Sequence, residues 1–163
     1  MQPAILLGFD SQGRGEYRNI INVQTEKQFS RYEQKSFGYY IVASKNYDLM
    51  GGNIGIHFGI NKSLETEDGD DDFNIFFGID KEINRSISFM LEYDAMLNDN
   101  NNEYDYQDIT LENIALGNGI GYFNAGFRWF IADNILIELN FNDINNEKYF
   151  NAYFSKYNIH YVI

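Results

Sequence analysis

The residues best suited to acid–base chemistry are the two histidines, His57 and His160. A hydrolase with a nucleophilic serine places a histidine beside a serine and a carboxylate, so that the imidazole can take the serine proton. The partners that the sequence offers are Ser44, Ser88 and Glu92. No nucleophile motif surrounds any serine, and a histidine in an enclosed polar network needs only hydrogen-bond partners. We therefore expect a protein that is not an enzyme, with a hydrolase using His57 or His160 as an alternative.

Carboxylates concentrate in two stretches, residues 62–71, which Asp72 follows directly, and residues 99–118. Carboxylate oxygens are ligands that calcium prefers, although neither stretch has the spacing of an EF-hand loop. Glu65 and Glu67 can add oxygen ligands in the first stretch, and Asp99, Glu103, Asp105 and Asp108 supply such ligands in the second. We expect both stretches to be solvated loops, because runs of like charge resist burial. The cofactor to consider is Ca²⁺, with Asp68, Asp70, Asp71 and Asp72 as its ligands.

The composition excludes several classes of protein. A net charge of −12 argues against a nucleic-acid partner, which needs clustered Lys and Arg to replace phosphate counterions. The absence of cysteine removes disulfides, thiol catalysis and Cys-based zinc sites. No run approaches the roughly 18 apolar residues of a membrane helix, and Met1-Gln2-Pro3 does not begin a signal peptide. Aromatic residues at 17% and a single proline favour strands.

Alternation of apolar and polar residues is the strongest structural signal. Residues 51–61 place Ile54, Ile56, Phe58 and Ile60 on one face and Asn53, Gly55, His57, Gly59 and Asn61 on the other, because successive strand residues point to opposite sides. The same pattern recurs in residues 72–80, 86–98, 119–131 and 135–143. Shorter or less regular strands are expected at residues 4–9, 38–46 and from about residue 153. The total is eight strands.

The connections alternate in length, which indicates how the strands are joined. Those after the first, third, fifth and seventh strands are long and polar, and the others are short. Antiparallel strands then place all long loops at one end, as in bacterial outer-membrane barrels. We predict an all-β fold, an antiparallel up-and-down transmembrane β-barrel of about eight strands. Residues 1–163 form a single β-barrel domain, which can be part of a larger barrel.

Alternation alone does not decide whether the apolar face meets lipid or a dry core. Four glycines lie on the polar face, where a narrow interior needs room for long side chains: Gly55, Gly59, Gly78 and Gly126. The apolar face is rich in aromatic residues and includes Trp129, as an interfacial girdle would require. Both features favour lipid. The alternative is a soluble β-barrel that binds an apolar ligand in its interior.

An enclosed polar face requires that its charges be paired. If residues 132–134 form a three-residue hairpin loop, Ile131 faces Ile135 and Arg128 lies opposite Glu138. We predict an ion-pair network in the lumen built on Arg128, Glu138, Glu92 and Asp94. Further charged residues expected to join it are Lys45, Lys156 and His160.

Two segments are similar to a known family. Residues 3–10 (PAILLGFD), followed by Gly13 and Gly15, and residues 40–45 (YIVASK) resemble paired strands of an outer-membrane barrel family associated with exopolysaccharide export. The resemblance covers the first three strands and transfers no functional residue. It implies an outer-membrane location and membership of a larger barrel. The alternation of Tyr157, Ile159, Tyr161 and Ile163 is similar to the assembly signal of outer-membrane strands, which usually ends on an aromatic residue.

We therefore expect a non-enzymatic protein of the bacterial outer membrane. Its partners would be the lipid bilayer and a surface polysaccharide or protein that binds the long acidic loops. Its role would be structural or adhesive, because an eight-stranded barrel is filled by side chains and leaves no general channel.

Overall fold

A computed structural model of the chain describes residues 2–11, 13–49, 51–100, 105–110, 113–114, 116, 121–132, 135–142, 144, 149–156 and 159–162. This part of the protein is all-β with antiparallel sheets, which confirms the predicted fold class. One 3₁₀ turn, η1 (Leu97–Asp99), is the only helical segment in these ranges. None of the described helical residues forms a span long and apolar enough to cross a membrane.

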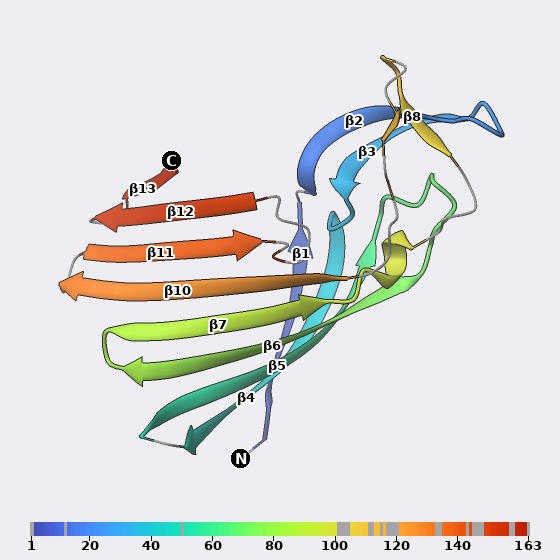
Figure 1. The fold of residues 1–163 in the computed structure, drawn as a ribbon. Helices are drawn as coiled ribbons and strands as arrows, with labels where there is room; N and C mark the ends of the chain where they lie inside the picture. Colours follow the sequence, from blue (N-terminus) through green and yellow to red (C-terminus); the bar gives the residue numbers. More distant parts are fainter. Residues whose placement is uncertain are drawn as a thin grey trace.

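The larger sheet has nine strands, which curve together in Figure 1. In spatial order they are β1 (Ala4–Asp10), β4 (Gly38–Leu49), β5 (Gly52–Ser63), β6 (Phe73–Asn84), β7 (Ile87–Asp94), β10 (Tyr122–Ala132), β11 (Ile135–Asn142), β12 (Tyr149–Lys156) and β13 (Ile159–Val162). Every neighbouring pair is antiparallel. The predicted strands therefore exist, and the last one is divided into β12 and β13.

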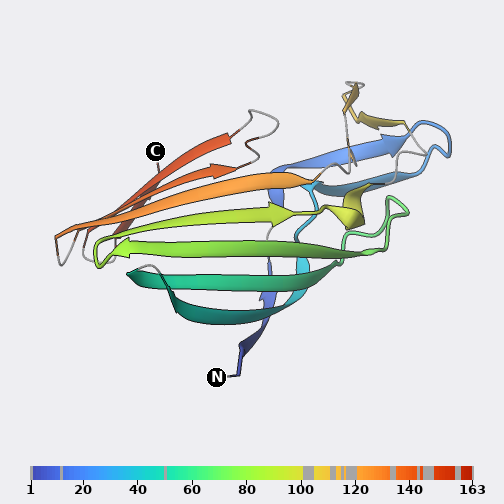
Figure 2. The same ribbon diagram turned by 60° about the horizontal axis from the view of Figure 1, so that its bottom comes forward.

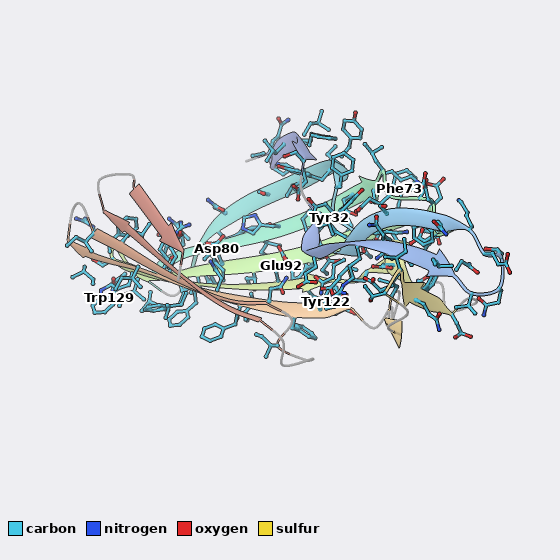
Figure 3. All side chains as sticks on the ribbon, turned by 90° about the horizontal axis from the view of Figure 1, so that it is seen from above. Tyr32, Phe73, Asp80, Glu92, Tyr122 and Trp129 are labelled. Carbon is cyan, nitrogen blue, oxygen red and sulfur yellow. The ribbon has the colours of Figure 1, made fainter. Side chains whose placement is uncertain are left out.

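The two faces of the sheet differ as the alternation predicts. Apolar-face side chains are exposed, with Phe58 at 46%, Phe89 at 48% and Leu91 at 56% of their full area. On the opposite face Asn74 and Asn124 are buried. Figure 3 shows Asp80 and Glu92 within the curve of the sheet and Trp129 outside it. The sheet thus curves around its polar face.

The prediction of a closed eight-stranded barrel is wrong in the described part of the chain. The sheet is open, with β1 at one edge and β13 at the other. Because nine strands alternate in direction, β1 and β13 run the same way and cannot pair as antiparallel neighbours. The edge strand β1 is exposed on both faces, with Leu6 at 58% and Leu7 at 75%.

Two of the connections that were expected to be long polar loops form strands instead, which corrects that prediction. They supply a four-stranded sheet made of β2 (Arg14–Asn22) and β3 (Gln28–Gln34) from one connection and β8 (Tyr106–Asp108) and β9 (Asn113–Ile114) from another. Figure 2 shows β2 and β3 at the same end of the large sheet as η1. A small apolar core of Ile20, Phe29, Tyr106 and Leu116 stabilises this second sheet.

The tight turns all lie at the other end of the large sheet, as predicted. The β10–β11 connection differs in detail from the expected three-residue loop. Ala132 pairs with Ile135, and a bulge between Phe130 and Ala132 restores the register of the remaining strand. Because a bulge adds one residue to one strand, Arg128 still lies opposite Glu138.

Candidate functional site

Polar side chains hydrogen-bond across every neighbouring strand pair from β4 to β11. The contacts are Ser44–His57, His57–Asp80, Asn74–Asp94, Glu92–Asn124 and Arg128–Glu138. Burying polar groups is costly unless they are hydrogen-bonded, and these contacts satisfy that requirement along the curved face. This face therefore carries a row of hydrogen-bonded polar side chains that runs from β4 to β11.

The predicted lumen residues lie on this face but do not form one network. Arg128 Nε donates to Glu138 Oε1 at 2.6 Å, across β10 and β11. Glu92 instead accepts from Asn124 Nδ2 at 2.8 Å. Asp94 accepts from Asn74 Nδ2 at 2.7 Å, so neither acid contacts Arg128 in the described hydrogen bonds.

Of the three additional predicted members, Lys45 lies away from this network. Lys45 occupies the outer face, where its Nζ lies 5.1 Å from the centre of the Tyr47 ring. Long basic side chains reach along apolar surfaces in this way while keeping the charge near water. The side chains of Lys156 and His160 are outside the described residues.

One set of contacts on the polar face joins a serine, a histidine and a carboxylate. His57 Nδ1 lies 2.8 Å from Ser44 Oγ, directly across β4 and β5. His57 Nε2 lies 2.6 Å from Asp80 Oδ1 on β6. Sequence reasoning named His57 and Ser44 but missed Asp80, and it also named Ser88 and Glu92, which lie on β7 without a described contact to His57.

Gly55 makes room for the Asp80–His57 contact. Gly55 lies opposite Asp80 in the β5–β6 register, and a Cβ at this position would collide with Asp80 Oδ1. Gly59 is covered by the Phe76 ring in the same way. The expectation that glycines on the polar face accommodate larger neighbours is confirmed at these two positions.

The acidic residues predicted to bind calcium have different surroundings, and two of them are buried. Asp68 and Asp70 are 6% and 7% exposed, so the prediction of a solvated loop is wrong for them. The backbone carbonyl of Asp70 accepts from Lys35 Nζ at 2.8 Å. Asp71 pairs with Lys62, and Asp72 is exposed. In the ranges that the structure describes, no group of three or more His, Cys, Asp or Glu side chains could hold a metal.

Asp68 belongs instead to a buried charge cluster made of Arg31, Lys35, Asp68 and Asp99. Arg31 contacts Asp68 and forms a parallel pair of bonds with Asp99, at 3.0 and 2.6 Å. Lys35 Nζ donates to Asp68 Oδ1 at 2.7 Å. Two positive and two negative charges therefore balance, and the cluster joins β3 to the β5–β6 loop and to η1.

All five N–H donors of Arg31 have acceptors in this cluster and in the adjoining backbone. Burial acts to lower the pKa of Arg31, but the neighbouring Asp99 and Asp68 carboxylates outweigh it and hold the pKa above its ordinary value. The guanidinium is therefore a permanent charge around which the carboxylates are arranged.

A half-open cavity of about 580 Å³ lies beside this cluster, between β2–β3 and the β5–β6 loop. Its aromatic lining consists of Tyr17, Phe29, Tyr32 and Phe37. Its charged lining consists of Arg31, Glu65 and Glu67. Ligand sites commonly combine aromatic walls with a few polar groups in a space of this size.

Glu65 presents an unused acceptor within the cavity lining. Its Oε1 accepts the backbone N–H of Tyr32 at 2.8 Å, whereas its Oε2 is enclosed without a hydrogen-bond partner among the described residues. Burial raises the pKa of Glu65, although the Tyr32 N–H and Arg31 act to lower it. An unpaired buried polar atom is costly, and this one has almost no accessible surface, so a ligand in the cavity would reach it only after a change of the Glu65 rotamer.

Comparisons with protein-family models, curated proteins and solved structures find no match to this chain. Its function is therefore inferred from its own geometry.

Proposed function

We propose that this chain is part of the wall of an outer-membrane β-barrel, with its apolar face against lipid. The observation that carries this proposal is the exposure of that face, which includes Phe58, Phe77 and Phe123 at 46%, 45% and 53%. Soluble monomers rarely expose contiguous apolar patches larger than a few hundred Å². Four of the strands have 11 or 12 residues, and about 9–11 residues span a bilayer on a tilt.

The open edges support a larger barrel. The row of unpaired backbone groups along β1 needs a partner, because lipid supplies none. Since β1 and β13 run in the same direction, further strands between them would complete an antiparallel wall. The soluble alternative, with an apolar ligand inside, would need the apolar face within the curve, which is the opposite arrangement.

The single tryptophan provides the test. Trp129 is 40% exposed on the apolar face, so brominated acyl chains should quench its fluorescence in reconstituted vesicles, and aqueous iodide should not. As a matched control, Trp129→Phe combined with Tyr122→Trp moves the fluorophore to the polar face of the same strand, where lipid quenching should be lost. A monomer that stays in solution without detergent and is quenched only by iodide would contradict the proposal.

A second role is favoured by the cavity at the loop end. We infer that it binds a hydroxyl-rich ligand, the chemistry of a surface polysaccharide, through its aromatic walls and the Glu65 and Glu67 carboxylates of its lining. Calorimetry with two hexasaccharides tests this, one of glucose, which is neutral, and one of glucosamine, which carries amino groups. Tyr17→Ala should weaken binding at least tenfold, about 1.4 kcal/mol. Tyr39→Ala should leave binding unchanged, because Tyr39 lies outside the cavity lining. It is a matched control because its exposed fraction, 59%, is close to the 61% of Tyr17. No heat with either sugar, or equal loss in both variants, would contradict this role.

A further inference from the structure

We propose that Ser44, His57 and Asp80 form a catalytic site that hydrolyses short-chain acyl esters on the polar face of the sheet. The site draws one residue from each of three adjacent strands, β4, β5 and β6. This activity goes beyond the structural and binding roles proposed above, and it does not depend on either of them.

The proposed roles fix where the hydrogens lie in these two contacts. An ionised Asp80 can only accept, so His57 Nε2, at 2.6 Å, carries the hydrogen of that bond. Neutral His57 then has a lone pair on Nδ1, which accepts the Ser44 hydroxyl proton across 2.8 Å. A serine, a histidine base and an orienting carboxylate are the groups that serine acyl transfer requires, here with the serine on Nδ1 and the carboxylate on Nε2.

Each chemical step balances with these groups and water alone. Ser44 Oγ attacks the carbonyl carbon of the ester while His57 Nδ1 takes the hydroxyl proton. The bond to the leaving alcohol then breaks, and Nδ1 returns the proton to the alcohol oxygen. Water attacks the acyl-serine ester with Nδ1 again as base, the carboxylic acid leaves, and Ser44 regains its proton. Asp80 is a positioning residue, since it orients the ring and stabilises its charged form.

The surroundings leave room for a small substrate. Gly78 lies opposite His57, and a Cβ there would fit at ordinary contact distance, 3.6 Å from His57 Cβ, so the glycine leaves room for about one methyl group beside the imidazole. The side chains of His57 and Asp80 are 33% and 32% exposed. The Phe76 ring covers Gly59, two residues from His57 in β5, and supplies an apolar contact for a short acyl chain.

Asn46 is suited to stabilise the oxyanion. It follows Ser44 by two residues in β4, which places both on the same face about 6.6 Å apart. It is exposed and lies opposite Gly55, which has no side chain to cover it. Its amide N–H is the type of donor that stabilises a tetrahedral intermediate.

Fluorophosphonate labelling followed by mass spectrometry tests the site in the full-length, detergent-folded protein. The reagent should attach to Ser44 Oγ with loss of fluoride, and p-nitrophenyl acetate should be hydrolysed. Ser44→Ala should abolish both reactions. Ser88→Ala is the matched control. It removes a serine that lies on the same polar face of the sheet but on β7, and it should leave both reactions unchanged.

The positioning and donor roles have separate readouts. Asp80→Asn should lower kcat about 10²–10⁴-fold with little change in KM, and Asn46→Ala should lower kcat about 10²-fold or more. A raised KM with an unchanged kcat in Asp80→Asn or Asn46→Ala would overturn the proposal. So would wild-type protein that is not labelled, or labelling that survives Ser44→Ala. Circular dichroism of each variant establishes that it is folded. Ser44→Cys keeps a nucleophile at this position, so this variant should still be labelled, by an ester probe that alkylates thiols. None of these results depends on whether Trp129 contacts lipid.

Discussion

Asp68→Asn removes one negative charge from a buried cluster that is electrically balanced. The side chains of Arg31 and Lys35 are 2% and 0% exposed, and Asp68 contacts both. After the substitution, two buried cations share the single carboxylate of Asp99. Removing one partner of a buried ion pair costs about 3–5 kcal/mol. At roughly 2–4 °C per kcal/mol for a chain of this size, the melting temperature should fall by roughly 6–20 °C.

Asp71→Asn is the matched control, because it makes the same chemical change three residues away in the same loop. Its side chain is 68% exposed and pairs with Lys62 at the surface. An exposed ion pair contributes about 0–1 kcal/mol. Thermal unfolding of both variants, followed by circular dichroism in detergent, compares a buried with an exposed carboxylate at equal net charge.

A compensating substitution tests the cause of the loss. Lys35→Met in the Asp68→Asn background leaves Arg31 and Asp99 as a neutral pair, so stability should partly return. If Asp68→Asn melts within about 2 °C of Asp71→Asn, or if Lys35→Met lowers stability further, the account of the cluster as a balanced set of buried charges is refuted.

Two other substitutions test single interactions. Arg128→Ala should lower the melting temperature in detergent, because it removes the ion pair with Glu138. The Arg128 side chain is 43% exposed, so the expected loss of stability is about 1 kcal/mol. An unchanged melting curve would count against a stabilising role of this ion pair. Glu65→Gln should raise stability at neutral pH, because burial raises the pKa of Glu65 and so disfavours its charged form in the folded state. A raised folded-state pKa gives stability below the unfolded value of about 4.5 that is lost as the pH rises, so the variant's advantage should disappear in acid, and an advantage that persists there would contradict this reasoning.

Strand positions and faces were predictable because they depend on a period of two residues, which is visible locally. The five regular alternations correspond to β5, β6, β7, β10 and β11. Closure was not predictable in this way, because it depends on which edges meet and on how many strands intervene. The C-terminal region illustrates the point, since one strand was expected from about residue 153 and the structure forms β12 and β13.

Burial of the acidic loop was missed because its neutralising partners are distant in sequence. Arg31 and Lys35 precede Asp68 by 37 and 33 residues. The available signal was charge complementarity, because residues 11–37 are rich in Arg and Lys and lie before an acidic stretch. A run of carboxylates indicates a solvated loop only when no equally long basic segment can fold against it.

The polar-face contacts divide according to the length of the connection between their strands. The tight β4–β5 and β10–β11 turns fix the register, so the pairing of Ser44 with His57 and of Arg128 with Glu138 follows from counting residues back from each turn. Asp80 follows the long β5–β6 loop. Because a loop of this length does not define the register of its strands, the sequence does not predict that Asp80 lies beside His57. A serine site assembled across three strands also leaves no local motif around the nucleophile. In a curved sheet of this kind, the partners of a nucleophile can be read from the sequence only where every turn between their strands is short enough to define the register. Where one turn is long, the absence of a motif does not exclude a nucleophile.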